Sequence, residues 1–150
     1  MRLPAAMFVI PHIIGESTKE ETDIVWHGLI EYNSSKLPLK GDVPFIPVNR
    51  VMKDLDGNII AGVNCEVSYY WNTLYIEMLW VKEVYRKKGC GSKLLNEIEK
   101  SGKEQGCNLV HLETMDFQAK DFYIKNGYEV FGELDDVPTG HKRYYMKKIL

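Results

Sequence analysis

Apolar residues recur along this chain with two different periods, and the period distinguishes the expected helices from the expected strands. Thr18 and Glu21 form a capping box in front of the first helical pattern, which should end near Asn33. Gly106 is a C-terminal stop for the second helical pattern, and Asp116 is placed to cap a third. The expected helices therefore cover residues 18–33, 89–106 and 119–126.

Short runs of apolar and β-branched residues predict the strands, and turn residues separate these runs. Asp56-Gly57 is a strong hairpin signal between two of them, and Pro138-Thr139-Gly140 separates the last two. The stretch 34–47 is rich in proline and is expected to be a loop with at most one short helix. The expected strands cover residues 7–14, 48–53, 59–68, 74–81, 109–114, 129–134 and 143–148.

The order of these elements predicts an α+β fold, in which a mixed sheet carries helices on its faces. No repeat or shift in composition divides the 150 residues, so we expect residues 1–150 to form a single domain. A hydrophobic fraction of 45% and a charged fraction of 27% are typical of a globular protein with one hydrophobic core.

Charge and cysteine content narrow the function classes. A net charge of −2 argues against a nucleic-acid partner held mainly through its phosphates. The sequence has three cysteines, Cys65, Cys90 and Cys107, which cannot all form pairs and lie far apart in the chain. This argues against the disulfide framework of a secreted protein. No apolar stretch approaches the roughly 18 residues of a membrane span, and the short one after Arg2 lacks a cleavage site. We therefore expect a soluble cytoplasmic protein without a membrane partner.

The most informative segment is the basic, glycine-rich stretch of residues 86–93, Arg-Lys-Lys-Gly-Cys-Gly-Ser-Lys. Glycines let the backbone approach a ligand closely, and the helix that follows offers unpaired N–H groups at the positive end of its dipole. Such a site prefers an anion, and a phosphate fits best. The alternative for this segment is a surface turn with a solvated basic run.

Three phosphate-binding loops compete for this segment. A Walker A loop ends in Gly-Lys-Ser/Thr, which is absent here. A dinucleotide fingerprint requires a third glycine where Leu94 stands, although Glu113 is placed where a ribose-binding acid would lie. A pyrophosphate loop of the form Arg/Gln-x-x-Gly-x-Gly/Ala fits without omissions through Arg86, Gly89 and Gly91.

Two motifs in sequence order resemble signatures of the GNAT superfamily of acetyl-CoA-dependent N-acetyltransferases. The first, similar to its acetyl-CoA-binding motif, is Leu79-Trp80-Val81 followed by Arg86-x-x-Gly89-x-Gly91. The second is Ala119-x-x-Phe122-Tyr123-x-Lys125-x-Gly127-Tyr128. The resemblance covers roughly residues 74–130. It implies a mixed, mostly antiparallel sheet that is splayed between its central strands, with helices on both faces.

The resemblance implies acetyl-CoA as cosubstrate and no metal. In the family the strand matching residues 74–81 pairs with the pantetheine arm, and amides of the following loop hold the pyrophosphate. Asp116 stands where the family often has an asparagine that contacts the cofactor arm, although an ionised aspartate cannot donate. The expected cofactor-binding residues are Leu79, Trp80, Val81, Arg86, Lys87, Lys88, Gly89, Cys90, Gly91, Ser92 and Asp116.

Members of the family transfer the acetyl group directly to an amine, which requires an acid, a base and an oxyanion donor. Tyr123 matches the tyrosine that commonly serves as the acid, and the Leu79 amide is the expected oxyanion donor. Glu77 is the expected general base, because period-two alternation puts it on the strand face of Leu79. His111 and Glu113 on the neighbouring strand are alternatives.

We therefore expect an enzyme that acetylates a primary amine of a small molecule, a peptide or a protein. The acceptor should bind between the first helix, the 34–47 loop and the last hairpin. Its identity and the permitted acyl length stay open, and the resemblance leaves a homodimer open. Two other functions stay open as well: a non-catalytic acyl-CoA-binding sensor module and a small nicotinamide-dependent oxidoreductase.

Overall fold

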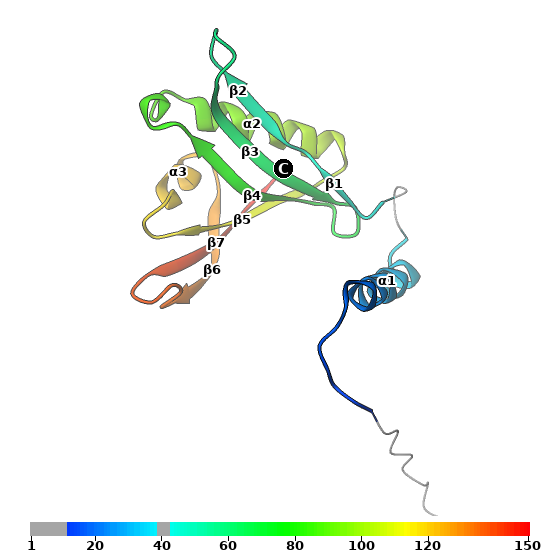
Figure 1. Ribbon diagram of the computed structural model, residues 1–150. Helices are drawn as coiled ribbons and strands as arrows, with labels where there is room; N and C mark the ends of the chain where they lie inside the picture. Colours follow the sequence, from blue (N-terminus) through cyan, green and yellow to red (C-terminus); the bar gives the residue numbers. More distant parts are fainter. Residues whose placement is uncertain (1–11, 39–42) are drawn as a thin grey trace, which may run out of the picture. The chain divides into compact units, whose positions relative to one another are not determined.

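The computed structural model describes residues 12–38 and 43–150, and the chain divides into two compact units, Met1–Lys36 and Leu37–Leu150 (Figure 1). The first unit contains helix α1, Lys19–Lys36. Its predicted capping box is confirmed, since the Thr18 N–H donates to Glu21 Oε2 at 2.7 Å and the Glu21 N–H donates to Thr18 Oγ1 at 3.2 Å. Of the strand predicted over 7–14, residues 7–11 lie outside the described ranges, and residues 12–14 have no regular structure.

The second unit is built on a seven-stranded sheet with the strand order β1-β3-β4-β5-β7-β6, in which β2 also pairs with β3. Neighbouring strands run antiparallel except β4 and β5, which are parallel (Figure 1). The predicted α+β class and the mostly antiparallel sheet are therefore confirmed. The strands are β1 Phe45–Pro47, β2 Arg50–Lys53, β3 Ile59–Ser68, β4 Thr73–Val81, β5 Leu109–Met115, β6 Glu129–Asp135 and β7 Lys142–Ile149.

Two helices and a short 3-10 turn complete this unit: α2 Cys90–Glu104, α3 Lys120–Lys125 and η1 Glu83–Tyr85. The apolar residues of α2 fall on one side at helical spacing, so that Leu95 and Ile98 are fully buried in a cluster with Val110 and Met146 of the sheet. The core of the unit therefore lies between α2 and one face of the sheet.

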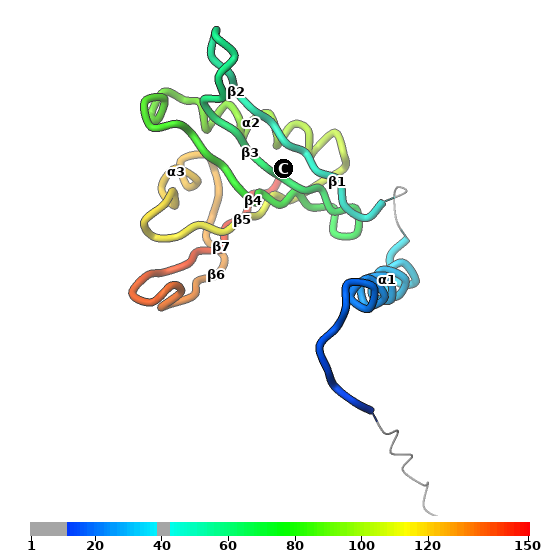
Figure 2. Tube along the Cα trace, viewed as in Figure 1, coloured from blue at the N-terminus to red at the C-terminus, as the bar shows by residue number. Residues whose placement is uncertain are grey.

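The sheet is splayed where its only parallel pair ends, among the strands that the structure describes. Residues Thr73 to Ile76 of β4 pair with Leu109 to Leu112 of β5, and the two strands then diverge (Figure 2). The rest of β4 keeps its bonds to β3 but has no partner in β5. A doubly wound dinucleotide-binding fold requires a mostly parallel sheet. The sheet therefore lacks the doubly wound fold on which the oxidoreductase alternative depends.

Two local expectations were wrong. Residues Phe45–Pro47, expected within a loop, form an edge strand on β3, where a proline is tolerated because its missing donor faces away from the sheet. Helix α3 begins after Ala119 without a side-chain cap, so Asp116 does not cap it. The Ala119 N–H instead donates to Thr114 Oγ1 at 3.3 Å.

Candidate active site

A cavity of about 1060 Å³ opens where β4 and β5 diverge. The loop of residues 86–92 lines one end and Tyr123 of α3 contributes to its wall. The volume is at the upper limit of the roughly 300–1,000 Å³ that small-molecule sites span, so an extended ligand fits. All the predicted cofactor-binding and catalytic residues line this cavity except Lys88, whose Nζ lies 5.6 Å from the centre of the Tyr85 ring.

The backbone at the start of α2 presents a series of free donors. Gly89 caps the helix in the left-handed conformation, with φ 82°, and Lys87 is also left-handed, with φ 58°. The first bond of the helix runs from the Lys93 N–H to the Gly89 carbonyl at 3.0 Å. In the described ranges, no amide of residues 87–92 donates to a protein acceptor. These amides are therefore available to an anion.

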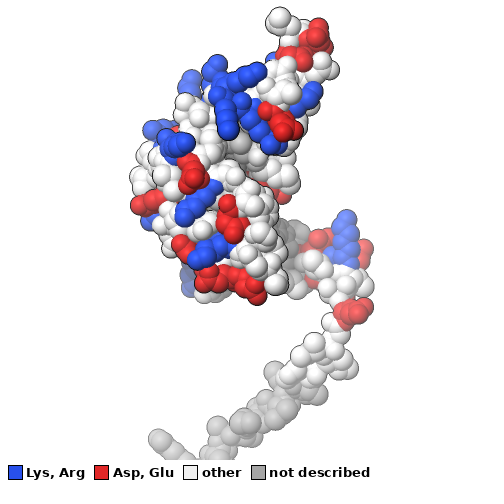
Figure 3. Space-filling view, turned by 90° about the vertical axis from the view of Figure 1, so that its left-hand side faces the viewer, with Lys and Arg blue, Asp and Glu red and all other residues white. Residues whose placement is uncertain are grey.

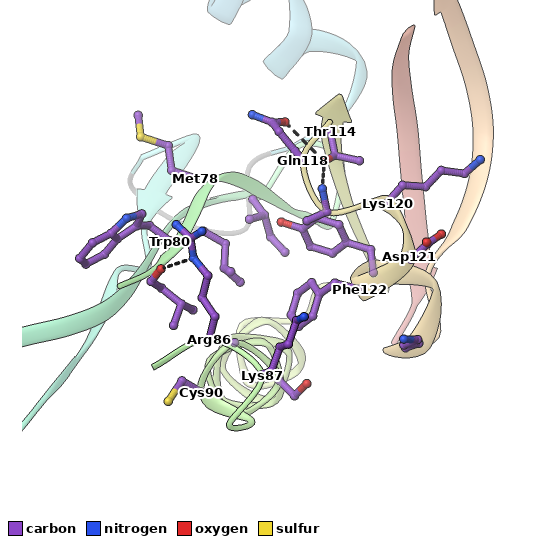
Figure 4. A pocket seen from close by; sticks show the side chains of 18 of the residues that line it. Met78, Trp80, Arg86, Lys87, Cys90, Thr114, Gln118, Lys120, Asp121 and Phe122 are labelled. Carbon is purple, nitrogen blue, oxygen red and sulfur yellow. Dashed lines mark hydrogen bonds between the residues drawn. The ribbon is translucent and has the colours of Figure 1, made fainter. Parts of the chain in front are cut away.

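Positive charge surrounds this loop. Lys and Arg side chains gather on the upper part of the face shown in Figure 3, where the loop between β4 and α2 lies. Arg86 also fixes the loop, because its Nε donates to the Val81 carbonyl at 3.0 Å (Figure 4). The loop thus combines free amides with a basic surface, a combination that suits a diphosphate.

Sequence reasoning missed several residues across the opening. Figure 4 shows Met78 on one side, beside the predicted Trp80, and Thr114, Gln118 and Phe122 on the other. Gln118 Oε1 accepts a bond from the Met115 N–H at 2.8 Å, which closes the end of β5. Phe122 belongs to the second sequence motif, directly before Tyr123, and its place in that motif could have identified it as a cavity residue.

The register of β4 changes at Glu77. Cys65 pairs with Ile76 and Asn64 with Met78, so Glu77 is an extra residue without a partner in β3. Ile76 is buried, whereas Glu77 and Met78 are both exposed. Leu79 faces α2, since its Cδ2 atom lies 3.7 Å from the position that a Cβ on Gly91 would occupy. Strict alternation, which put Glu77 on the face of Leu79, therefore fails at this bulge, although Glu77 still lines the cavity.

The candidate bases differ in their partners. Glu113 Oε2 accepts a bond from Arg143 Nη1 at 2.9 Å. Burial lowers the pKa of His111, and the nearby Glu113 acts in the opposite direction, so the imidazole is neutral near pH 7. In the part of the chain that the structure describes, no hydrogen bond or ion pair holds the exposed carboxylate of Glu77. Glu77 is therefore the least restrained of the three.

Asp116 lines the cavity, but its carboxylate binds the turn between β6 and β7. Oδ1 lies 3.0 Å from Nδ1 of His141, and Oδ2 accepts a bond from the Lys142 N–H at 3.2 Å. The ring of Phe117 contacts the His141 imidazole edge-on, with 4.8 Å between centroids. The structure therefore gives Asp116 a role in shaping the cavity rim, and its contact with the cofactor arm stays a prediction.

Tyr123 is 6% exposed and packs in the core while contributing to the cavity wall. Burial raises the pKa of Tyr123 to about 12, with a smaller contribution from Cys65. Its hydroxyl therefore stays protonated throughout the neutral range.

Within residues 12–38 and 43–150, no group of three or more His, Cys, Asp or Glu side chains is arranged to hold a metal ion. None of the helices in the same ranges combines the length and apolar character that a membrane crossing requires.

Comparisons with known proteins agree with this geometry. A model of the acetyltransferase (GNAT) domain matches residues 50–130. A crystal structure of an acetyltransferase from Bacillus cereus ATCC 14579 is 38% identical, with a TM-score of 0.84 over 93% of this chain and 98% of the other. The blasticidin-S acetyltransferase of Streptomyces morookaense is 34% identical over 95 residues, 63% of this chain and 68% of the relative.

A protein of Bacillus anthracis str. Ames, solved in complex with acetyl coenzyme A, shares the fold. It is 23% identical, with a TM-score of 0.61 over 69% of this chain and 62% of the other. The GNAT domain match covers more than half of the chain, and it includes β4, the basic loop and α3. The protein therefore belongs to the GNAT family of acetyltransferases.

Proposed function

We propose that this protein transfers an acetyl group from acetyl-CoA to a primary amine by direct attack within a ternary complex. The observation that supports this most directly is the single cavity that joins the free amides of residues 87–92 to Tyr123. Acetyl-CoA, when bound, supplies the acetyl group as a thioester. The likeness to a protein solved with acetyl coenzyme A supports this choice of cosubstrate.

In this proposal two backbone segments bind the cosubstrate. The amides of residues 87–92 hold the pyrophosphate, assisted by the positive charge of Arg86 and Lys87. The edge of β4 beyond Ile76 binds the pantetheine arm in the manner of an added strand. Because the Val81 carbonyl already accepts a bond from Arg86, Leu79 is the main strand residue for that arm.

Tyr123 acts on the sulfur in the proposed reaction. A C–N bond forms as the C–S bond breaks, and the departing thiolate requires a donor. The pKa of Tyr123, about 12, lies well above the value near 8.5 of a free thiol, so complete proton transfer costs about 5 kcal/mol. Tyr123 therefore serves chiefly as a hydrogen-bond donor to the sulfur. The nitrogen loses its second proton to water as the amide forms, and the thiolate gains its proton from water. The Leu79 N–H donates to the carbonyl oxygen.

Glu77 is the proposed base. The acceptor ammonium has a pKa of about 10.4 and must lose a proton before it attacks. Glu77 lines the cavity at the bulge of β4, and its carboxylate is exposed to water that relays this proton. Glu113 is the weaker candidate because Arg143 already engages it.

Blasticidin S is the first acceptor to test, because a 34% identical relative is a blasticidin-S acetyltransferase. We propose that the acceptor approaches along the rim formed by Phe117, Asp116 and the turn that carries His141. A panel of antibiotic amines, polyamines, peptide N-termini and lysine peptides covers the remaining classes.

The test follows thiol release from acetyl-CoA with each amine of this panel. The wild-type protein should release thiol with at least one amine, and Tyr123→Phe should lower kcat about 10²-fold. Tyr145→Phe is the matched control, because Tyr145 packs on Phe131 of the β6–β7 hairpin; its kcat should stay within about twofold.

The alternative is a non-catalytic acyl-CoA sensor that uses the same loop. Such a module would stabilise on binding acetyl-CoA, by about 2.7 kcal/mol at 100 times its dissociation constant. It would nevertheless release no thiol with any amine, and Tyr123→Phe would change nothing measurable. These two results together would replace the enzymatic proposal with the sensor.

A further inference from the structure

A partly buried ionic network lies next to Tyr123, and its residues do not line the cavity. Glu99 of α2 is 9% exposed, and among the described residues it is the one charged side chain in the buried set. Its Oε1 accepts a bond from the Tyr128 hydroxyl at 2.9 Å, and its Oε2 accepts one from Lys148 Nζ at 2.7 Å. The network thus joins α2, β7 and the segment between α3 and β6.

The Tyr128 end of this network lies in the apolar core. Leu95 and Ile98, on the same helix, are fully buried, and Tyr128 is 3% exposed. The Glu99 side chain is 11% exposed and that of Lys148 is 26% exposed, so the carboxylate loses most of its hydration and the ammonium loses part of it. Because of this desolvation cost, such a pair contributes little net stability compared with apolar residues of similar volume. The geometry of the network is nevertheless well defined, because each carboxylate oxygen of Glu99 accepts a hydrogen bond from a different donor. A role in positioning therefore explains this network better than a role in stability alone.

Tyr128 connects the network to Tyr123 in two ways. Its backbone N–H donates to the Tyr123 carbonyl at 3.0 Å. Its ring meets the Tyr123 ring edge-on, with 5.6 Å between the centroids and an interplanar angle of 67°. The Lys148 side chain passes within 3.5 Å of the position that a Cβ on Gly127, the residue before Tyr128, would occupy. The groups that fix Tyr128 therefore fix the end of α3 as well.

Glu99 also shares a helix with the proposed pyrophosphate site. It lies eight residues after Gly91, about 12 Å along the helix axis at 1.5 Å per residue. One rigid element therefore carries both the amides that would hold the cosubstrate and the carboxylate that holds Tyr128.

We propose that Glu99 is a positioning residue, which acts through Tyr128 to set the Tyr123 hydroxyl at a fixed distance from the pyrophosphate loop. This inference rests on the proposed role of Tyr123 as donor to the sulfur. Loss of the network should leave cosubstrate binding intact and should misplace the donor. The defect should therefore fall on kcat and leave the KM for acetyl-CoA unchanged.

A double-mutant cycle tests this inference. Glu99→Gln and Tyr128→Phe each remove one part of the network at nearly constant volume. Each should lower kcat about tenfold, with the KM for acetyl-CoA within about twofold. Combined with Tyr123→Phe, neither should lower kcat further by more than about twofold, because the group they position is gone.

Ser101→Ala is the matched control. Ser101 is a second buried polar residue of α2, and its Oγ accepts a bond from Arg50 at 3.0 Å. It should reduce stability, measured by urea unfolding, without the kcat defect. If Glu99→Gln and Tyr128→Phe lower kcat equally with and without Tyr123, or change kcat only as much as Ser101→Ala, the network is merely structural and the inference is wrong.

The proposed role of Tyr123 and the proposed role of Glu99 can be tested separately. Tyr123→Phe alone decides the role of Tyr123, since an unchanged kcat would overturn that role and the positioning of Glu99 with it. A kcat defect in Tyr123→Phe together with full additivity in the cycle would overturn only the inference about Glu99. If Glu99→Gln does not fold, the milder Tyr128→Phe carries the cycle.

Discussion

Gly91 of α2 lies directly against Phe122 of α3: a Cβ on Gly91 would be 2.9 Å from Cζ of Phe122. The two residues belong to different sequence motifs, one in the basic loop and one in the motif that contains Tyr123. Phe122 in turn contacts Tyr123, with 5.2 Å between the ring centroids. The start of α2 is therefore packed onto the helix that carries the proposed acid, and glycine is the residue that permits this approach.

Gly91→Ala should disturb both ends of the site. The added methyl forces Phe122 to move, at a cost of about 1–3 kcal/mol in the free energy of unfolding, and the shift passes to Tyr123. We expect lower kcat and a higher KM for acetyl-CoA in thiol-release assays. Phe122→Leu in the same chain should relieve the clash and restore part of the stability. Gly132→Ala is the control, because a Cβ on Gly132 would lie 3.6 Å from its nearest neighbouring atom, which is an ordinary contact distance. An equal loss of stability and activity in Gly132→Ala would contradict this prediction.

Lys87 and Lys88 are adjacent in sequence but should differ in function. Lys87 lines the cavity, whereas the Lys88 ammonium lies 5.6 Å from the centre of the Tyr85 ring. Lys87→Asn, which suits the left-handed backbone at that position, should raise the KM for acetyl-CoA several-fold, and the effect should shrink at high salt. Lys88→Asn should leave KM within about twofold. Equal effects of the two substitutions would show that only the net charge of the loop matters.

The identity of the base is tested by two matched substitutions. Glu77→Gln should lower kcat/KM for the amine about 10²-fold, because the carboxylate that accepts the proton is lost. Glu113→Gln removes a carboxylate of the same cavity that is already paired with Arg143, and its effect should be much smaller. The measurement is a pH–rate profile of each variant. If Glu113→Gln has the larger effect, the assignment of Glu77 is wrong.

The buried tyrosines predict a loss of stability at alkaline pH. Burial raises the pKa of Tyr123 to about 12, and burial together with Glu99 raises the pKa of Tyr128 as well. An unfolded tyrosine ionises near pH 10, so above that pH the folded state holds protons that the unfolded state has lost. The stabilisation is complete below pH 10 and falls by about 1 kcal/mol for each buried phenol between pH 10 and 11.

Urea unfolding between pH 9 and 11 measures this slope. Tyr128→Phe should flatten it relative to the wild-type protein, whereas Tyr145→Phe should change it little. Identical slopes in all three proteins would show that the Tyr128 phenol does not contribute to the loss of stability at alkaline pH.

The regular parts of the fold could be predicted because local signals and tertiary packing agree there. The capping box of Thr18, the hairpin at Gly57 and the apolar side of α2 each combine a turn or cap residue with a matching period. The strand Phe45–Pro47 could not be predicted, since its three residues form a strand only through their pairing with β3.

The candidate site could be predicted only as far as its motifs extend. The loop around Gly89 and the position of Tyr123 follow from residue types at fixed spacing. The bulge at Glu77 follows from the register of β3 against β4, which no local pattern encodes. The bonds of Asp116 and Glu99 join residues that are far apart in the chain, so their partners become visible only once the sheet and its helices are assembled.

The central claim is that the amides of residues 87–92 bind the pyrophosphate of acetyl-CoA. Amide NMR spectra recorded on addition of coenzyme A, and separately on addition of pantetheine, which lacks the pyrophosphate, test it most directly. We predict large downfield shifts of these amides with coenzyme A and small ones with pantetheine, while the amides of β4 from Glu77 to Val81 respond to both. Unchanged amides at residues 87–92 in the presence of saturating coenzyme A would contradict the claim.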